Sequence, residues 1–228
     1  MPYVKFKYDA FEDGENILRV LTTSPQYDIE NAARSLKGLD SILIEKVQTE
    51  KDYLIKQQLI AEHLSKYIPN NQKLISTKIQ SFQEAWDKIN EIYFQRLAKL
   101  LNIQIPKNNI YTAYLTQGGS CPFNVSERWF MVRLADEKVD VIAAHEIMHI
   151  EFIRAYGLYC KNKELPSEQF GILKEGLTVL LNEEMGDILS RLDYGYPEHQ
   201  DLRNKILTLW RKNKNFKDLL EKMIRFLK

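Results

Sequence analysis

The chain has 228 residues, of which 44% are hydrophobic, and its formal net charge is +1. A chain of this length and composition can bury a sizeable core, as one domain or as one domain with a helical extension. A charge so near zero excludes a global electrostatic attraction to nucleic acid or to an anionic membrane. We therefore expect no nucleic acid partner.

The first residues predict a strand rather than a targeting segment. Residues 1–8 alternate apolar side chains with lysines, and acidic residues follow at once, so no signal peptide is expected there. The chain has no run of eighteen apolar residues, and we expect no membrane span. Cys121 and Cys160 are too few for a disulfide framework, which favours a reduced, cytoplasmic setting. Cys121 could approach a functional site as a thiolate, but an ordinary loop residue is the favoured interpretation.

Helical patterns dominate the N-terminal third after this strand. Residues 29–47 have a helical pattern that Gly38 interrupts, and residues 50–68 are amphipathic with a helical period. Pro69-Asn70-Asn71 then predicts a turn. Residues 74–101 carry apolar side chains at steps of three and four, which is typical of one long helix packed on a core.

These patterns suggest a boundary near residue 70. Residues 1–70 are predicted to form an N-terminal strand and helical extension, and residues 71–228 the main domain with C-terminal helices. Because strands are few and helices many, the fold class is predicted as α+β, mostly helical, with a small sheet.

Two strands are predicted before the central helix. Residues 110–116 and 128–134 have strand patterns, and the loop over residues 117–124 is rich in glycine and polar residues. The second strand could be an open edge that pairs with an extended peptide, or an internal strand already paired on both sides. The sequence favours neither arrangement.

The segment His145-Glu146-Ile147-Met148-His149 is the chain's strongest chemical signal. Two histidines four apart on a helix project from one face, so both imidazoles can bind one Zn²⁺. Glu146 would lie near the open coordination position, where a carboxylate can take a proton from water. Apolar residues flank the motif on both sides, and neither proline nor glycine occurs between residues 134 and 156, so a buried helix is expected. The alternative is an ordinary histidine pair in a core helix, but its polar groups would then need other partners.

A catalytic zinc usually has three protein ligands, so a third donor is expected downstream. Glu175 lies in an apolar helical segment, where an acid needs a partner. Glu183 lies in a more polar segment, and its default interpretation is a solvated helix face. We therefore favour Glu175 as the third ligand. Glu183 is the alternative ligand, or a residue that orients a histidine from behind.

The remaining sequence predicts helices and one turn. Gly157 is expected to end the histidine helix, and the next helix is expected over residues 168–189. Residues 203–228 mix lysines and arginines with apolar residues at helical spacing. A docked helix pair with solvated lysines is favoured over a basic surface for membrane or nucleic acid.

On these residues the chain resembles the zincin metallopeptidases, and more narrowly the gluzincins, in which an HExxH helix is followed by a glutamate on a second helix. Residues 174–177 (Lys-Glu-Gly-Leu) are similar to the segment that bears the third ligand in the aminopeptidase-like branch. Residues 182–187 are similar to the corresponding segment of the thermolysin branch, but they lie farther from His149 than in that branch. The aminopeptidase segment Gly-x-Met-Glu-Asn, which reads a free amino terminus, is missing here. The resemblance therefore does not extend to exopeptidase specificity.

The resemblance implies a minimal zincin-like catalytic domain and a zinc-dependent hydrolysis of peptide or protein amide bonds. His145, His149 and Glu175 would bind Zn²⁺, and Glu146 would be the general base. Because negative charge develops on the carbonyl oxygen, a donor is expected opposite the metal, and Tyr196 and His199 are the candidates. An aromatic turn without a catalytic role is the alternative for both, and it is slightly favoured.

Two other functions stay open at the level of sequence. The chain could be a catalytically inactive zincin-like module that binds metal or a partner. It could also be a helical interaction protein in which HExxH is coincidental. Metal content and peptide hydrolysis distinguish the three.

Overall fold

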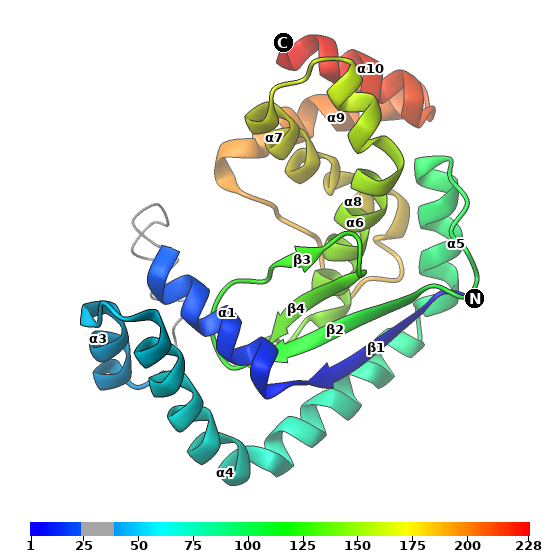
Figure 1. Ribbon diagram of the computed structural model, residues 1–228. Coiled ribbons are helices and arrows are strands. Elements are labelled where there is room, and N and C mark those ends of the chain that lie inside the picture. Colours follow the sequence, from blue (N-terminus) through cyan, green and yellow to red (C-terminus); the bar gives the residue numbers. More distant parts are fainter. Residues whose placement is uncertain (24–38) are drawn as a thin grey trace.

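The computed structural model describes residues 1–23 and 39–228, and its fold is α+β and mostly helical, as predicted. Figure 1 shows a small sheet at the centre, with helices along one face and at both ends. The helix predicted over residues 29–47 falls partly outside the described residues. Within them, α3 covers Ser41–Thr49 and begins at Asp40, whose carboxylate accepts a hydrogen bond from the Ile42 amide.

The sheet is mixed, with strand order β1-β2-β4-β3. Its strands are β1 (Tyr3–Tyr8), β2 (Ile110–Thr116), β3 (Phe123–Asn124) and β4 (Trp129–Arg133). The β1–β2 and β2–β4 pairs are parallel, and β3 is antiparallel to β4. The predicted strands over residues 1–8, 110–116 and 128–134 are thus confirmed. The two-residue β3 was not predicted, because it is too short to show an alternating pattern.

β4 is an internal strand, which decides between the two arrangements that the sequence left open. It pairs with β2 on one side and with β3 on the other. The Met131 amide also donates to the Pro122 carbonyl at 2.9 Å, so the segment around β3 covers this side of β4. On this side of the sheet the edge strand is therefore β3 and not β4.

One face of the sheet forms the main core. Tyr111, Ala113 and Leu115 alternate along β2 and are almost fully buried, as are Phe130 and Val132 of β4. They pack in one hydrophobic cluster with residues of α4 (Tyr53–Asp87), α5 (Asn90–Leu101) and α6 (Val139–Asn162). The period of two in β2 thus fixes the face against which the histidine helix packs.

The turn predicted at Pro69-Asn70-Asn71 is wrong, because α4 continues through it. Proline removes one backbone donor and crowds the preceding turn, so it bends a helix without always ending it. Figure 1 shows α4 bending near its middle. The predicted helix over residues 74–101 is divided instead at Lys88–Ile89, where the Ile89 amide bonds to the Trp86 carbonyl at 2.9 Å.

The boundary expected near residue 70 falls inside α4. α1 (Ala10–Thr23), α3 and the first half of α4 do form a small hydrophobic cluster of their own. β1, however, pairs with β2 and contributes Val4 and Phe6 to the main core. The N-terminal part therefore shares a strand pair and a helix with the rest of the chain.

A buried polar network fixes α1 to the loop that follows β2. The Asp13 carboxylate accepts a hydrogen bond from the Thr116 hydroxyl at 2.6 Å. The Asn16 amide donates to the Gly118 carbonyl at 3.2 Å. Gly119 has a φ of +108°, and a Cβ there would lie only 2.6 Å from the Asn16 side-chain nitrogen, so a larger residue does not fit. α1 thereby positions the loop that leads into β3.

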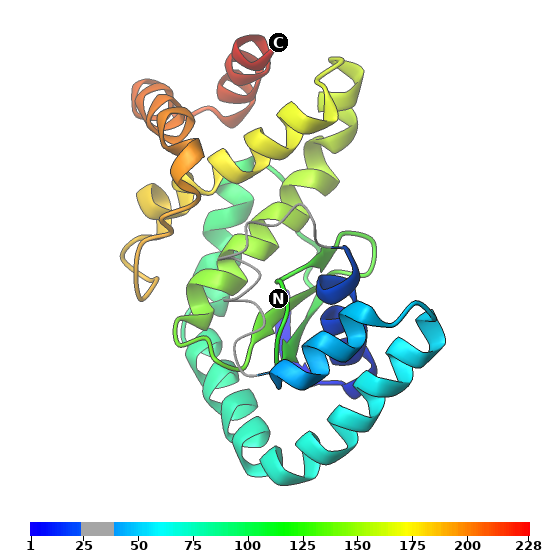
Figure 2. The same cartoon turned by 90° about the vertical axis from the view of Figure 1, so that its left-hand side faces the viewer.

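The histidine helix α6 is longer than predicted. Gly157 lies inside it, and the helix continues to Asn162 before Glu164 adopts a left-handed conformation with a φ of 55°. Gly157 is therefore not the predicted end, since a glycine costs a helix only about 1 kcal/mol and the helix is anchored by buried residues before it and by the buried Cys160 after it. Figure 2 shows α7 (Ser167–Leu177) running back along α6, and the two helices are in contact.

The helix predicted over residues 168–189 is two helices, α7 and α8 (Val179–Met185). They meet at Thr178, whose hydroxyl donates to the Glu175 carbonyl at 2.9 Å. The favoured interpretation of the tail is confirmed, since α9 (Gln200–Lys212) and α10 (Phe216–Leu227) form a docked helix pair with buried apolar faces. Among the described helices, none has the length and apolar character needed to cross a membrane.

Candidate metal centre

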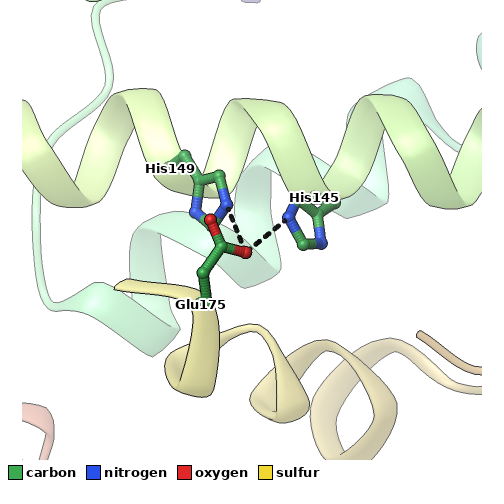
Figure 3. A group of neighbouring side chains, drawn as sticks. All are labelled: His145, His149 and Glu175. Carbon is green, nitrogen blue, oxygen red and sulfur yellow. Dashed lines mark ion pairs between the residues drawn. The ribbon is translucent and has the colours of Figure 1, made fainter. Parts of the chain in front are cut away.

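The two histidines of the HExxH motif lie one turn apart on α6 and face the same side (Figure 3). Their ring centroids are 4.3 Å apart. His149 is only 2% exposed, and apolar neighbours surround this part of α6. Both imidazoles are thus held close together in a largely buried environment, as the i, i+4 spacing predicts.

Glu175 reaches the same point from α7 (Figure 3). Its Oε2 lies 3.4 Å from Nε2 of His145 and 3.3 Å from Nε2 of His149. One donor atom from each of the three residues lies within 4.8 Å of the others, so the group could hold a metal ion. Glu183, the alternative ligand, instead binds the Arg211 guanidinium at 2.7 Å.

The donor set fits a divalent cation such as Zn²⁺. Nε2 of His149 is buried and has no hydrogen-bond partner among the described residues, although the Glu175 carboxylate is close. A buried polar atom without a partner is costly, and coordination would satisfy it. Two imidazole nitrogens and one carboxylate oxygen are a common set of three for catalytic zinc, and they also suit iron, cobalt or manganese.

The three side chains of the cluster have strongly shifted pKa values. Burial lowers the pKa of His145, but its hydrogen bond to Asp193 and its contact with Glu175 outweigh burial and raise that pKa to about 10. Burial, together with the neighbouring His145, lowers the pKa of His149 to about 3. Burial raises the pKa of Glu175, but the two histidines outweigh it and hold this pKa well below its usual range. The cluster therefore already carries an ionised carboxylate and one neutral imidazole.

Asp193 fixes the orientation of His145, which sequence reasoning did not anticipate. Its Oδ2 lies 2.6 Å from Nδ1 of His145, leaving Nε2 to face the cluster. Asn182 exchanges two hydrogen bonds with the Asp193 backbone, at 2.7 and 2.8 Å, and the buried Arg203 binds the Asp193 carbonyl. The sequence offered Glu183 as a residue that could orient a histidine from behind, but the residue in that position is Asp193. A carboxylate behind a metal-binding histidine typically sets its tautomer and raises its basicity.

We predict that Asp193→Asn flattens the pH dependence of zinc binding. Below pH 10, zinc must displace a proton from His145, because its pKa is about 10, so affinity in the native protein should rise with pH by about tenfold per unit. Without the carboxylate this pKa falls, and the affinity should level off at a lower pH. Competition titrations of zinc at several pH values between about 7 and 9 measure the slope.

The exposed Asp187, which pairs with Arg96, provides the matched control. Asp187→Asn should leave the pH dependence of zinc binding as it is in the native protein. Parallel pH profiles for the native protein and Asp193→Asn would contradict the role assigned to Asp193.

Lys174 and Phe123 complete the surroundings of the cluster, and neither was predicted. The Lys174 ammonium lies 2.5 Å from Oε1 of Glu175, so the ligand's second oxygen already has a partner. The same ammonium lies 5.0 Å from the centre of the Phe123 ring, and that ring is 5.5 Å from the His149 ring. The edge strand β3 therefore borders the candidate metal centre.

The Glu146 side chain lines a pocket beside His145. The residues that line it are Cys121, Arg133, Val141, Ile142, His145, Glu146, Arg191, Leu192, Asp193, Tyr194 and Gly195. Burial raises the pKa of the Glu146 carboxyl to about 7, although His145 opposes that shift. A carboxylate with a pKa near neutrality suits proton transfer at physiological pH.

Cys121 also lines this pocket, but its thiol is kept neutral. Burial, reinforced by the nearby Glu146, raises the pKa of the Cys121 thiol to about 12. Since reactivity depends on the thiolate, this supports the favoured interpretation of Cys121 as an ordinary loop residue.

Tyr196 and His199 are not among the residues that line the pocket. Their rings pack against each other, with centroids 5.8 Å apart, where the chain enters α9. Both rings thus lie in an aromatic turn outside the lining of this pocket, and a catalytic role for either stays a prediction. The tyrosine that does line the pocket is Tyr194, two residues earlier in the same segment.

Comparison of the chain with models of protein families, with curated proteins and with solved structures gives no match. The resemblance to the gluzincins therefore rests on the HExxH motif and the downstream glutamate in the sequence, and it stays a prediction. The geometry of His145, His149 and Glu175 defines a candidate metal centre.

Proposed function

We propose that this protein is a zinc-dependent peptidase that hydrolyses peptide or protein amide bonds. One observation supports the proposal most strongly: His145, His149 and Glu175 converge beside a pocket that Glu146 lines. Three ligands on one side and a carboxylate base at an accessible pocket are the parts that metal-assisted hydrolysis needs.

The residues divide the work according to their surroundings. His145, His149 and Glu175 would hold Zn²⁺, which lowers the pKa of water and polarises a carbonyl when it is bound. Glu146 would take the proton of the attacking water and pass it to the leaving amine, a task that suits its raised pKa of about 7. Asp193 keeps His145 in the orientation that ligation requires, because it accepts from Nδ1.

Tyr194 is the side chain that best fits the role of donor to the developing oxyanion. It lines the pocket and is 68% exposed, so its hydroxyl is accessible to a bound substrate. In this proposal Tyr194 replaces Tyr196 and His199, the two residues that the sequence suggested as donors to the oxyanion.

The proposal is tested by measuring metal content and hydrolysis together. Purified protein should bind one zinc per chain, and a broad library of quenched fluorescent peptides should be cleaved only by the metal-loaded form. Chelation should stop cleavage and lower Tm, and zinc should restore both. Bound zinc without cleavage of any peptide would favour the inactive metal-binding module. Protein that binds no metal, with a Tm unchanged by chelation, would overturn the metal centre itself.

A further inference from the structure

Residues 191–195 line one side of the pocket that Glu146 also lines, and two backbone hydrogen bonds, at Ser190 and at Asp193, hold this segment in place. The Ser190 amide donates to Oδ2 of Asp140, at the start of α6, at 2.6 Å. The Asp193 amide donates to the Asn182 side chain on α8 at 2.7 Å. Arg191 and Leu192 lie between these two anchors. Their backbone is therefore held in place beside the proposed base.

Arg191 is an uncommitted cation in this pocket. The pocket has two arginines, but the Arg133 guanidinium pairs with the Asp136 carboxylate at 3.1 Å. Arg191 is exposed and forms no hydrogen bond or ion pair within residues 1–23 and 39–228. The pocket also has two acidic residues. Asp193 contacts His145, and Glu146 is the proposed base, so neither is assigned as a partner of Arg191.

Exposed apolar side chains line the same pocket as Arg191. Leu192 is 48% exposed and Tyr194 is 68% exposed, and both line the pocket. The buried Val141 and the half-buried Ile142 contribute from the first turn of α6. A wall with exposed apolar side chains and a free cation suits a ligand with an anionic group next to an apolar one.

We propose that Arg191 binds a carboxylate of the substrate next to the scissile bond, so that the protein prefers peptides with an anionic group at that position. The inference rests on the proposed peptidase function. A guanidinium binds a carboxylate through two parallel hydrogen bonds, which makes it selective for the acid over the amide. The carboxylate has two sources in peptides, an acidic side chain and a free carboxyl terminus, and both present the same group.

The test uses three matched peptides and two variants. The first peptide has glutamate next to the scissile bond and an amidated end. The second has glutamine there and a free carboxyl terminus one residue beyond the bond, and the third has glutamine and an amidated end. Each is given to the native protein, to Arg191→Gln and to Arg225→Gln. Arg225 is an exposed arginine of α10 outside this pocket, so its variant matches the loss of charge.

The native protein should cleave at least one carboxylate peptide with a kcat/KM about tenfold above that of the neutral peptide. Arg191→Gln should remove this preference, and Arg225→Gln should keep it. If the first peptide is preferred, the bound carboxylate belongs to an acidic side chain. If the second peptide is preferred, it belongs to a free carboxyl terminus. Equal kcat/KM values for the three peptides in the native protein, or a preference that survives in Arg191→Gln, would overturn the proposal.

A binding measurement separates this inference from the proposed function. Zinc-loaded Glu146→Gln protein is titrated calorimetrically with the same three peptides, with and without Arg191→Gln. If the native protein cleaves nothing, yet a carboxylate peptide binds about tenfold more tightly only when Arg191 is present, the peptidase function fails and the carboxylate site stands. Equal affinities for all three peptides overturn the site as well.

Discussion

Glu146→Gln should lower the kcat of peptide hydrolysis by about a hundredfold to ten-thousandfold, which is the usual contribution of a general base. Glutamine has nearly the same shape as glutamate but cannot take a proton from water. The three proposed ligands stay in place, because Glu146 is not one of them. Zinc content should therefore equal that of the native protein, and its measurement by elemental analysis accompanies the kinetics.

Glu168→Gln is the matched control, because Glu168 is an exposed acid in the first turn of α7. This variant should hydrolyse peptides at the native rate. A Glu146→Gln protein that contains zinc and keeps its native kcat would remove Glu146 from the reaction. Loss of zinc in that variant would show that Glu146 supports the metal centre rather than the chemistry.

Removal of a ligand should have the second large effect. His149→Gln and Glu175→Gln should each lower zinc affinity by more than about a hundredfold, because even the outer partners of zinc ligands contribute about tenfold to a hundredfold. Hydrolysis should disappear with the metal. Competition with a chromogenic chelator measures the affinities, and the increase of Tm on zinc addition gives an independent measure.

Two further variants serve as controls for the ligand set. Glu183→Gln should keep native zinc affinity, because the Glu183 carboxylate pairs with Arg211. His199→Gln should also keep it, because His199 lies outside the group of three. If Glu183→Gln lost zinc while Glu175→Gln kept it, the assignment of the third ligand would be reversed.

Much of this site could be predicted from sequence because its spacing is local. His145 and His149 share a helix, so the 3.6-residue period alone places their rings together. Glu175 could be preferred over Glu183 because an acid inside an apolar segment needs a partner, and the structure brings it within 3.4 Å of both imidazoles. Both ends of β2 could be predicted correctly because its alternating pattern covers the whole strand.

The features that were missed depend on tertiary contacts. Asp193 lies in a turn-rich segment, and only the path of the chain after α8 brings it to His145. Nothing in its neighbourhood distinguished it, although a buried Arg203 further along indicates that an acid or carbonyl group must lie near. β3 and Lys174 lie beside the metal centre because of strand pairing and the course of α7. Gly157 and Pro69 show that a glycine or a proline inside a helical segment does not always end the helix.

The network between α1 and the loop after β2 affects how far the chain can be shortened. Thr116 and Gly118 are held by Asp13 and Asn16, and the same loop continues into the strand that carries Phe123 against His149. A chain begun at residue 71 would lack β1 and both anchoring side chains. The wall of the metal centre would then lose its support from the opposite side of the molecule. The N-terminal helix α1 is thus part of the scaffold that holds β3 beside the candidate metal centre.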